Sequence, residues 1–266
     1  MASCSVCGTD NTTQPVHPDS VAPWELKQCT NCSMLYLENP PAYEVLEEEL
    51  AWERTYAQET VTRKQRNPVL YALGRAPKAA VQAVLKRDKL RALAEQYIAP
   101  GPVLDVGCGG GAMLARLPRQ YVPCGIEISK ELATMARNTF TPRGGFVVQA
   151  DALRGLQQME AGYFTGIVMT SFLEHETNAR EVLEATRRVM SPGAGLIVKV
   201  PNYASWNRTL RGHKWCGFRF PDHVNYFTPV LLKRLLETTG FRIVRFNLGD
   251  RMPTSDTMWL VAEVRS

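Results

Sequence analysis

The stretch from Val103 to Gly111 combines a carboxylate with glycines in a way that suits a bound ligand. It reads Val-Leu-Asp-Val-Gly-Cys-Gly-Gly-Gly, an apolar segment typical of a strand that runs into a glycine-rich turn. Glycines at such a turn let the backbone approach a ligand closely and point amides at it. Asp105 stands two residues before the first glycine. The pyrophosphate of a dinucleotide gains nothing from a carboxylate there, whereas a cationic ligand tolerates one well.

Two further carboxylates follow the next two predicted strands. Glu127 lies 20 residues after Gly107, a spacing that suits a carboxylate accepting both hydroxyls of a ribose. Asp151 is placed to accept a hydrogen bond from an adenine amino group. With Asp105 and the glycines, they predict a pocket for an adenosyl sulfonium at the carboxyl ends of the strands. The residues expected to bind this cofactor are Asp105, Gly107, Gly109, Gly111, Glu127, Ile128, Asp151, Ala152 and Ser171.

Two of the four histidines stand where a methyl acceptor would lie. His175 follows Glu174 after the fourth predicted strand, and His223 belongs to a Pro-Asp-His segment expected to fold over the pocket. Histidine is the side chain best matched to accepting a proton near neutral pH. His175 is therefore the first candidate for a general base and His223 the second, with Glu174 beside them. Structural roles are the alternatives: a backbone hydrogen bond at a helix start for His175, and a bond that pins the lid for His223.

Four of the seven cysteines form two Cys-x-x-Cys pairs near the N-terminus. Cys4 and Cys7 make the first pair, and Cys29 and Cys32 make the second, with 21 residues between the pairs. Each pair places two thiolates on one tight turn, so that two such turns close a tetrahedron around a metal ion. The spacing predicts a structural Zn²⁺ site with no open position. Iron, unmetallated thiols and a redox pair are the alternatives.

Alternating strands and helices must position these residues. Strands are predicted at 103–106, 122–127, 145–149, 166–170, 195–200, 241–246 and 257–264. Helices are predicted at 86–98, 111–117, 129–138 and 178–190, and from the N-cap Thr228 to about Thr239. This alternation predicts a parallel sheet with helices on both faces. The aromatic, proline-punctuated stretch 201–227 is expected to be an insertion over the sheet edge.

The pattern of glycine loop, Glu127 and Asp151 resembles the class I S-adenosylmethionine-dependent methyltransferases over residues 103–200. The cysteine module followed by Met34–Pro41, and the run Pro221–Thr228, are similar to a subgroup with an N-terminal zinc ribbon. The resemblance implies an α/β, Rossmann-like fold with a mostly parallel seven-stranded sheet, a zinc ribbon and a lid insertion, and it implies S-adenosylmethionine as cofactor. Ser171 is a departure, because some relatives carry an acid there, and this argues against a catalytic metal.

Three regions follow from these patterns. Residues 1–41 are expected to form the zinc-binding module, and 42–99 a helical, partly basic linker or lid. Residues 100–266 are expected to form the methyltransferase domain, with the insertion 201–227 over the active site.

The composition of the chain limits the cellular compartments and the oligomeric states that are expected. The chain is 45% hydrophobic and 21% charged, which is ordinary for a soluble globular protein. No apolar run reaches the roughly 18 residues that span a bilayer, and no secretory signal is visible. A cytoplasmic monomer or homodimer is expected.

The leading functional hypothesis is methyl transfer to a small-molecule acceptor such as a sugar, a lipid-linked glycan or a natural product, with oxygen as the favoured target. The alternative is RNA methylation, with the zinc module and the basic stretch 62–91 as the docking surface. Aromatic residues that could stack bases are not interleaved with that stretch, which disfavours RNA. A non-catalytic S-adenosylmethionine-binding protein is the third hypothesis.

Overall fold

The computed structural model describes residues 3–41 and 88–264. Residues 1–40 and 93–266 belong to one compact unit, and 41–92 form a second one. Most of the second unit, including nearly all of the predicted basic stretch 62–91, lies outside the described residues. Among the described helices, none is long and apolar enough to cross a membrane.

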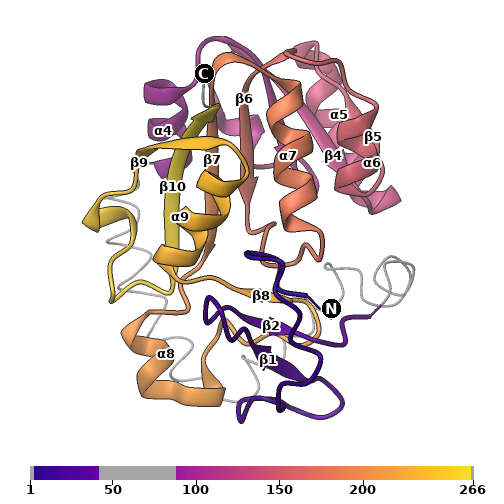
Figure 1. The fold of residues 1–266 in the computed structure, drawn as a ribbon. Coiled ribbons are helices and arrows are strands. Elements are labelled where there is room, and N and C mark those ends of the chain that lie inside the picture. The colour runs from indigo at the N-terminus through magenta and orange to yellow at the C-terminus, as the bar shows by residue number, and fades with distance from the viewer. Residues whose placement is uncertain (1–2, 42–87, 265–266) are drawn as a thin grey trace, which may run out of the picture. The chain divides into compact units, whose positions relative to one another are not determined.

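A seven-stranded sheet forms the centre of the first unit (Figure 1). Its strands are β3 (Gly101–Val106), β4 (Tyr121–Glu127), β5 (Val147–Gln149), β6 (Phe164–Thr170), β7 (Met190–Pro201), β9 (Phe241–Arg245) and β10 (Thr257–Val264). They lie in the order β5-β4-β3-β6-β7-β10-β9, and only β10 runs antiparallel to its neighbours. The predicted α/β fold with a mostly parallel seven-stranded sheet is confirmed.

Helices cover both faces of this sheet. They are α4 (Lys89–Tyr97), α5 (Lys130–Phe140), α6 (Ala152–Gln157), α7 (Ala179–Val189) and α9 (Pro229–Thr238), and a further helix, α8 (Trp206–Arg211), lies in the insertion. On β4, a Cβ atom at Gly125 would meet Phe140 of α5, whereas the next residue, Ile126, touches Gly155 of α6. Successive strand residues point to opposite faces, so α5 and α6 cover opposite faces. Burial on both sides explains why the central strands are nearly continuous apolar runs.

One predicted helix is absent from the described chain. Over 111–117 the protein forms only a 3-10 turn, Leu114–Arg116. Gly111 adopts a left-handed φ of +83°, which keeps it out of a helix, and Pro118 follows seven residues later and bounds the segment on the other side. By contrast α9 begins as predicted, because Thr228 caps it by accepting a hydrogen bond from the amide three residues on.

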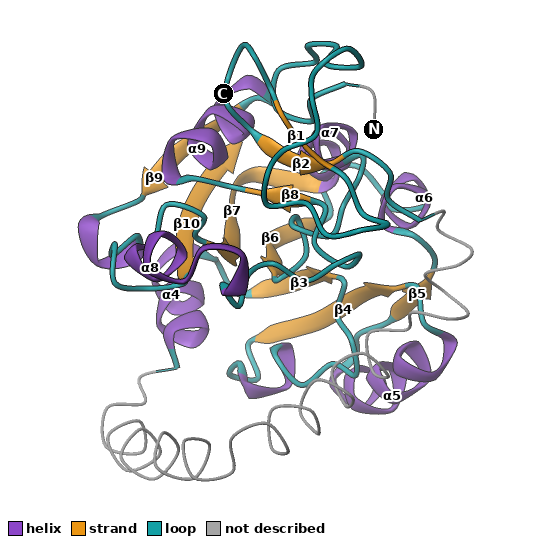
Figure 2. Ribbon diagram, turned by 90° about the horizontal axis from the view of Figure 1, so that it is seen from below, coloured by secondary structure: helices purple, strands orange, loops and turns teal. Residues whose placement is uncertain are grey.

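A second, three-stranded sheet joins the N-terminal segment to the insertion (Figure 2). It consists of β1 (Leu26–Gln28), β2 (Leu35–Leu37) and β8 (Asn225–Tyr226), all antiparallel. The hairpin of β1 and β2 comes from the cysteine module, whereas β8 comes from the predicted insertion 201–227. Trp215 and Tyr226 pack with the leucines of this sheet in a small apolar core of their own. Residues 3–40, which we call the ribbon, are therefore completed by a strand from a distant part of the chain.

Candidate active site and metal centre

The predicted cofactor residues follow the carboxyl ends of neighbouring parallel strands. The glycine loop follows β3, Glu127 ends β4 with Ile128 after it, and Asp151 and Ala152 come directly after β5. Ser171 follows β6 and adopts a left-handed φ of +54°. Parallel strands end at the same edge of a sheet. The structure therefore places the whole predicted set along one edge.

Asp105 is a buried carboxyl group at this edge of the sheet. The residue is 1% exposed, and its Oδ1 atom has no hydrogen-bond partner among the described residues. Burial, together with the nearby charge of Glu127, raises the pKa of Asp105 well above its usual range. A buried polar atom without a partner is costly. A cationic or hydrogen-bond-donating ligand at this atom would remove that cost.

Glu127 holds the glycine loop in shape. Its Oε2 accepts a hydrogen bond from the amide of Gly109 at 2.8 Å, and its Oε1 accepts one from the amide of Ser129 at 2.9 Å. Gly109 has a φ of +53°, a conformation that favours glycine. A carboxylate oxygen accepts about two hydrogen bonds, so these contacts are compatible with the predicted bonds to ribose hydroxyls.

Asp151 serves as the N-cap of α6. Its Oδ1 accepts a hydrogen bond from the amide of Arg154 at 2.9 Å, and its Oδ2 lies 3.4 Å from Nε of the same arginine. The side chain is therefore fixed at the start of the helix. Its contact with an adenine amino group stays a prediction.

The glycine loop is pressed against the segment that follows β6. At Gly107, φ is +74° and an added Cβ would lie 2.8 Å from the ring of Phe172. At Gly111, an added Cβ would lie 2.8 Å from the ring of Phe140 on α5. A side chain at either position would push the loop away from its neighbours. The close approach brings the loop next to the residues expected to act on the acceptor.

Glu174, His175 and His223 form one cluster, although they come from different segments. One ligand-type atom of each lies within 4.8 Å of the others. The two imidazole rings meet edge to face, with centroids 4.7 Å apart. Nδ1 of His175 donates to the carbonyl of Asp222, and Nδ1 of His223 donates to the carbonyl of Gly217, each at 2.8 Å. Because both Nδ1 atoms carry the proton, both Nε2 atoms present a lone pair.

Burial leaves this cluster uncharged near neutral pH. It raises the pKa of Glu174 to about 8 and lowers the pKa of His175 to about 4. Burial and the neighbouring His175 lower the pKa of His223 well below its usual range. Glu174 is 1% exposed, and its Oε2 has no hydrogen-bond partner in the described part of the chain. The cluster thus holds two neutral imidazoles, each with a free lone pair on Nε2, and one protonated carboxyl group.

Asn225 holds the segment of Glu174 in place, a role that sequence analysis missed. Its Nδ2 donates to the carbonyl of Leu173 at 3.0 Å and to that of Glu176 at 2.7 Å. Asn225 is 2% exposed. An amide side chain between the apolar Val224 and Tyr226 was a usable signal, because a buried polar residue needs a specific partner.

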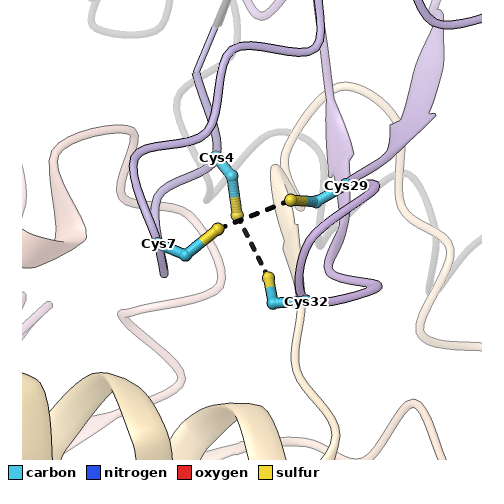
Figure 3. Close-up of side chains that lie close together, drawn as sticks. All are labelled: Cys4, Cys7, Cys29 and Cys32. Carbon is cyan, nitrogen blue, oxygen red and sulfur yellow. Dashed lines mark hydrogen bonds between the residues drawn. The ribbon is translucent and has the colours of Figure 1, made fainter.

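The four paired cysteines meet at one point of the ribbon (Figure 3). Their Sγ atoms lie within 4.8 Å of one another, with Cys4 and Cys32 at 3.5 Å and Cys7 and Cys29 also at 3.5 Å. Four sulfurs about 2.3 Å from a central ion would be about 3.8 Å apart, whereas a disulfide needs about 2.05 Å. The arrangement fits a four-coordinate ion and does not fit disulfides.

Without a bound cation, the four sulfurs would not all be ionised at neutral pH. Burial raises the pKa of Cys4 to about 11. Burial also acts on Cys7, but hydrogen bonds from Thr9 outweigh it and lower the pKa of Cys7 to about 6. Four thiolates this close together repel one another unless a positive ion lies among them.

Comparison with known proteins assigns the family. The sequence profile of a family described as "Methyltransferase domain" matches residues 78–245. The ubiquinone biosynthesis O-methyltransferase of Xanthomonas axonopodis pv. citri is 32% identical over 154 residues, which are 53% of this chain and 62% of the relative. That of Xylella fastidiosa is 32% identical over 113 residues, 41% of this chain and 43% of the relative. The chain therefore spans less than two thirds of these relatives.

Solved structures share the fold. An S-adenosylmethionine-dependent methyltransferase from Clostridium acetobutylicum has a TM-score of 0.53 at 10% identity, covering 67% of this chain and 89% of that one. The cyclase SpnF has a TM-score of 0.51 at 18% identity, covering 67% and 81%. At these identities the likeness concerns the fold alone. Because the family profile covers more than half of its length, the chain belongs to the methyltransferase-domain family, and its seven-stranded sheet has the fold of an S-adenosylmethionine-dependent methyltransferase.

Proposed function

We propose that the chain transfers a methyl group from S-adenosylmethionine to a hydroxyl oxygen of a small-molecule acceptor. The observation that carries the proposal is the cluster of Glu174, His175 and His223 beside the glycine loop. The contact between Phe172 and Gly107 keeps the cluster and the loop next to each other. A hydroxyl acceptor needs a proton acceptor close to the methyl donor, and this arrangement supplies one.

The loop side suits the chemistry of the cofactor. S-adenosylmethionine supplies a methyl group that a positively charged sulfur has already activated. Asp105 offers a buried carboxylate to the cationic end of the ligand, where its own pKa would fall as the charges pair. Glu127 would accept hydrogen bonds from the ribose hydroxyls, and Asp151 would accept one from the adenine amino group. The glycines let the backbone lie close to the ligand.

The acceptor side moves one proton. With S-adenosylmethionine bound, the acceptor oxygen would take the methyl group in exchange for its hydroxyl proton, which a residue of the chain must accept. The hydroxyl proton passes to Nε2 of His175, whose lone pair is available because its pKa is lowered to about 4. Its Nδ1–H bond to the carbonyl of Asp222 holds the ring in this tautomer and orientation. His223 is the second candidate acceptor of the proton, and the carboxyl group of Glu174 lies beside both rings.

The names of the relatives support a small acceptor and an oxygen target. Both relatives described above are called ubiquinone biosynthesis O-methyltransferases. We propose that this chain acts on the same kind of atom. The identity of its acceptor is left to experiment.

We also propose that Cys4, Cys7, Cys29 and Cys32 bind one Zn²⁺ ion. The support is the near-tetrahedral spacing of their sulfurs and the pairing of the cysteines on two tight turns. Four protein ligands leave the ion no open position, so its role is to hold structure.

The test is label transfer from methyl-tritiated S-adenosylmethionine into a cell extract that is then separated into small-molecule, RNA and protein pools. Label in the small-molecule pool supports the proposal, and label in RNA overturns the choice of acceptor. If no pool is labelled although S-adenosylhomocysteine binds in a titration, the chain is a non-catalytic binder. His175→Ala and His223→Ala should lower the rate about 10²-fold or more if each handles the proton. His213→Ala, an exposed histidine of the same insertion, is the matched control.

A further inference from the structure

Residues Val224 and Asn225 contact two parts of the molecule, the ribbon and the segment that follows β6. Asn225 lies in β8 and pairs with Tyr36 of the ribbon, while the carbonyl of Val224 accepts a hydrogen bond from the amide of Leu37 at 2.9 Å. The same two residues donate to the segment that follows β6. Their amides both bond to the carbonyl of Glu174, at 2.7 and 3.0 Å. Residues 224 and 225 therefore hydrogen-bond both to the ribbon and to the segment that carries Glu174 and His175. We call Glu174, His175 and His223 the acceptor cluster.

The side chain of Asn225 also bonds to both of these parts. Its Oδ1 accepts a hydrogen bond from Oγ of Ser5 at 2.9 Å, and Ser5 stands between the first two cysteines. Its Nδ2 donates to the carbonyls of Leu173 and Glu176. One buried amide thus spans from the cysteine turn on one side to both flanks of the Glu174–His175 turn on the other.

Two further contacts tie the same parts together. The guanidinium of Arg180, on α7, donates from Nη2 to the carbonyl of Val6 at 2.5 Å. Cys4, Met34 and Leu173 belong to one continuous apolar core that also contains the sheet. The cysteine turn is therefore packed against the segment that carries the acceptor cluster.

The turn at Glu174 and His175 depends on these donors. Buried carbonyls need hydrogen-bond partners. Those of Glu174 and Glu176 accept hydrogen bonds from residues 224 and 225, and that of Leu173 accepts one from Asn225 and one from the amide of Glu176. The amide of His223, directly before them, bonds to the carbonyl of Arg219 at 2.8 Å. A shift of residues 224 and 225 would move His175 and His223 relative to each other.

We infer that Asn225 is a positioning residue through which the metal-held cysteine turn fixes the Glu174–His175 turn against His223. The inference rests on the proposed function, because it assigns the metal site a part in acceptor turnover. The predicted cofactor residues on β3, β4 and β5 take no part in these hydrogen bonds, so cofactor binding should not depend on Asn225.

The test compares Asn225→Ala with Asn11→Ala in the full chain. Asn11 is a fair control because it is also buried, at 0% exposure, and its side chain interacts with Thr9, Thr30 and Tyr36 of the ribbon and not with the Glu174 segment. Hydrogen exchange is measured for the peptide covering 172–177. Label transfer into the extract and affinity for S-adenosylhomocysteine are measured alongside.

Asn225→Ala should speed exchange of the 172–177 peptide at least tenfold and lower label transfer about 10²-fold, since a displacement of about 1 Å in a catalytic group has that effect. Affinity for S-adenosylhomocysteine should stay within threefold. Chelation of the metal should reproduce all three results. Asn11→Ala should lower the melting temperature but leave exchange at 172–177 within threefold of wild type.

Equal effects of the two asparagine variants, or no change at 172–177 in Asn225→Ala, would overturn the inference. Should Asn225→Ala not fold, Ser5→Ala can replace it, because it removes only the hydrogen bond from Ser5 to Asn225. It should also speed hydrogen exchange of the 172–177 peptide. If wild-type protein labels nothing, the proposed function fails, whereas the exchange measurement still decides the role of Asn225.

Discussion

The buried carboxyl group of Glu174 should make the protein less stable as pH rises, and Glu174→Gln should abolish that effect. The pKa of Glu174 is about 8 in the folded protein against an ordinary value of 4.5. Between these values the folded state holds a proton that the unfolded chain has released. Stability then falls by about 1.4 kcal/mol per pH unit. From pH 6.5 to pH 8.0 the loss is about 2 kcal/mol.

Other titrating groups do not obscure the effect of Glu174 on stability between pH 6.5 and pH 8.0 when the variant is compared with wild type. The lowered pKa of His175 makes stability rise with pH, but only up to the ordinary histidine value of 6.5. The raised pKa of Asp105 acts in the same direction as that of Glu174, but it is present in both proteins and cancels in the difference. Gln has nearly the same shape as Glu and does not titrate. The difference in free energy of unfolding therefore reports on residue 174 alone.

Guanidinium unfolding at pH 6.5, 7.25 and 8.0 provides the measurement. The stability of Glu174→Gln relative to wild type should grow by about 2 kcal/mol across this range. Glu160→Gln, at an exposed glutamate, serves as the control and should show no such trend. A difference between Glu174→Gln and wild type that stays constant within about 0.5 kcal/mol would refute the buried, proton-holding state of Glu174.

Three further predictions concern the cofactor loop and the metal. Asp105→Asn should weaken S-adenosylhomocysteine binding about 10- to 100-fold by calorimetry, the usual effect of losing a charged hydrogen bond; unchanged affinity would remove Asp105 from the site. Gly107→Ala should lower the melting temperature by several degrees because its Cβ meets Phe172, whereas Gly109→Ala has open space and should cost less; the reverse order would contradict the close approach. Purified protein should contain about one zinc per chain by atomic absorption, and Cys32→Ser should lose it; equal metal content in both would show that the cysteines do not bind it.

The placement of the predicted cofactor residues along one edge of the sheet could be predicted because it depends on local sequence patterns. An apolar run that ends in glycines, followed at regular spacing by Glu127 and Asp151, requires only that parallel strands end on the same side. The N-cap at Thr228 was predictable for the same reason, since capping involves neighbours in the sequence.

The parts that could not be predicted depend on contacts between distant segments. A strand of two residues, Asn225 and Tyr226, is too short to show a periodic pattern in the sequence. Its pairing with β2 joins segments that are far apart in the sequence. The meeting of His175 with His223 is of the same kind. The 3-10 turn at 114–116 was missed because glycines that serve the loop also interrupt the helix.

The strand β8 also fixes an order of events during synthesis. Ser5 and Asn225 are 220 residues apart, so at roughly 5–20 residues per second the ribbon waits on the order of ten to forty seconds for its third strand to leave the ribosome. During that time β1 and β2 form only a two-stranded hairpin, which is marginally stable alone and has an open edge. Early metal capture by the cysteines would keep the hairpin together until residue 225 arrives. Metal supply during translation, and not only afterwards, should therefore set the yield of correctly folded chains.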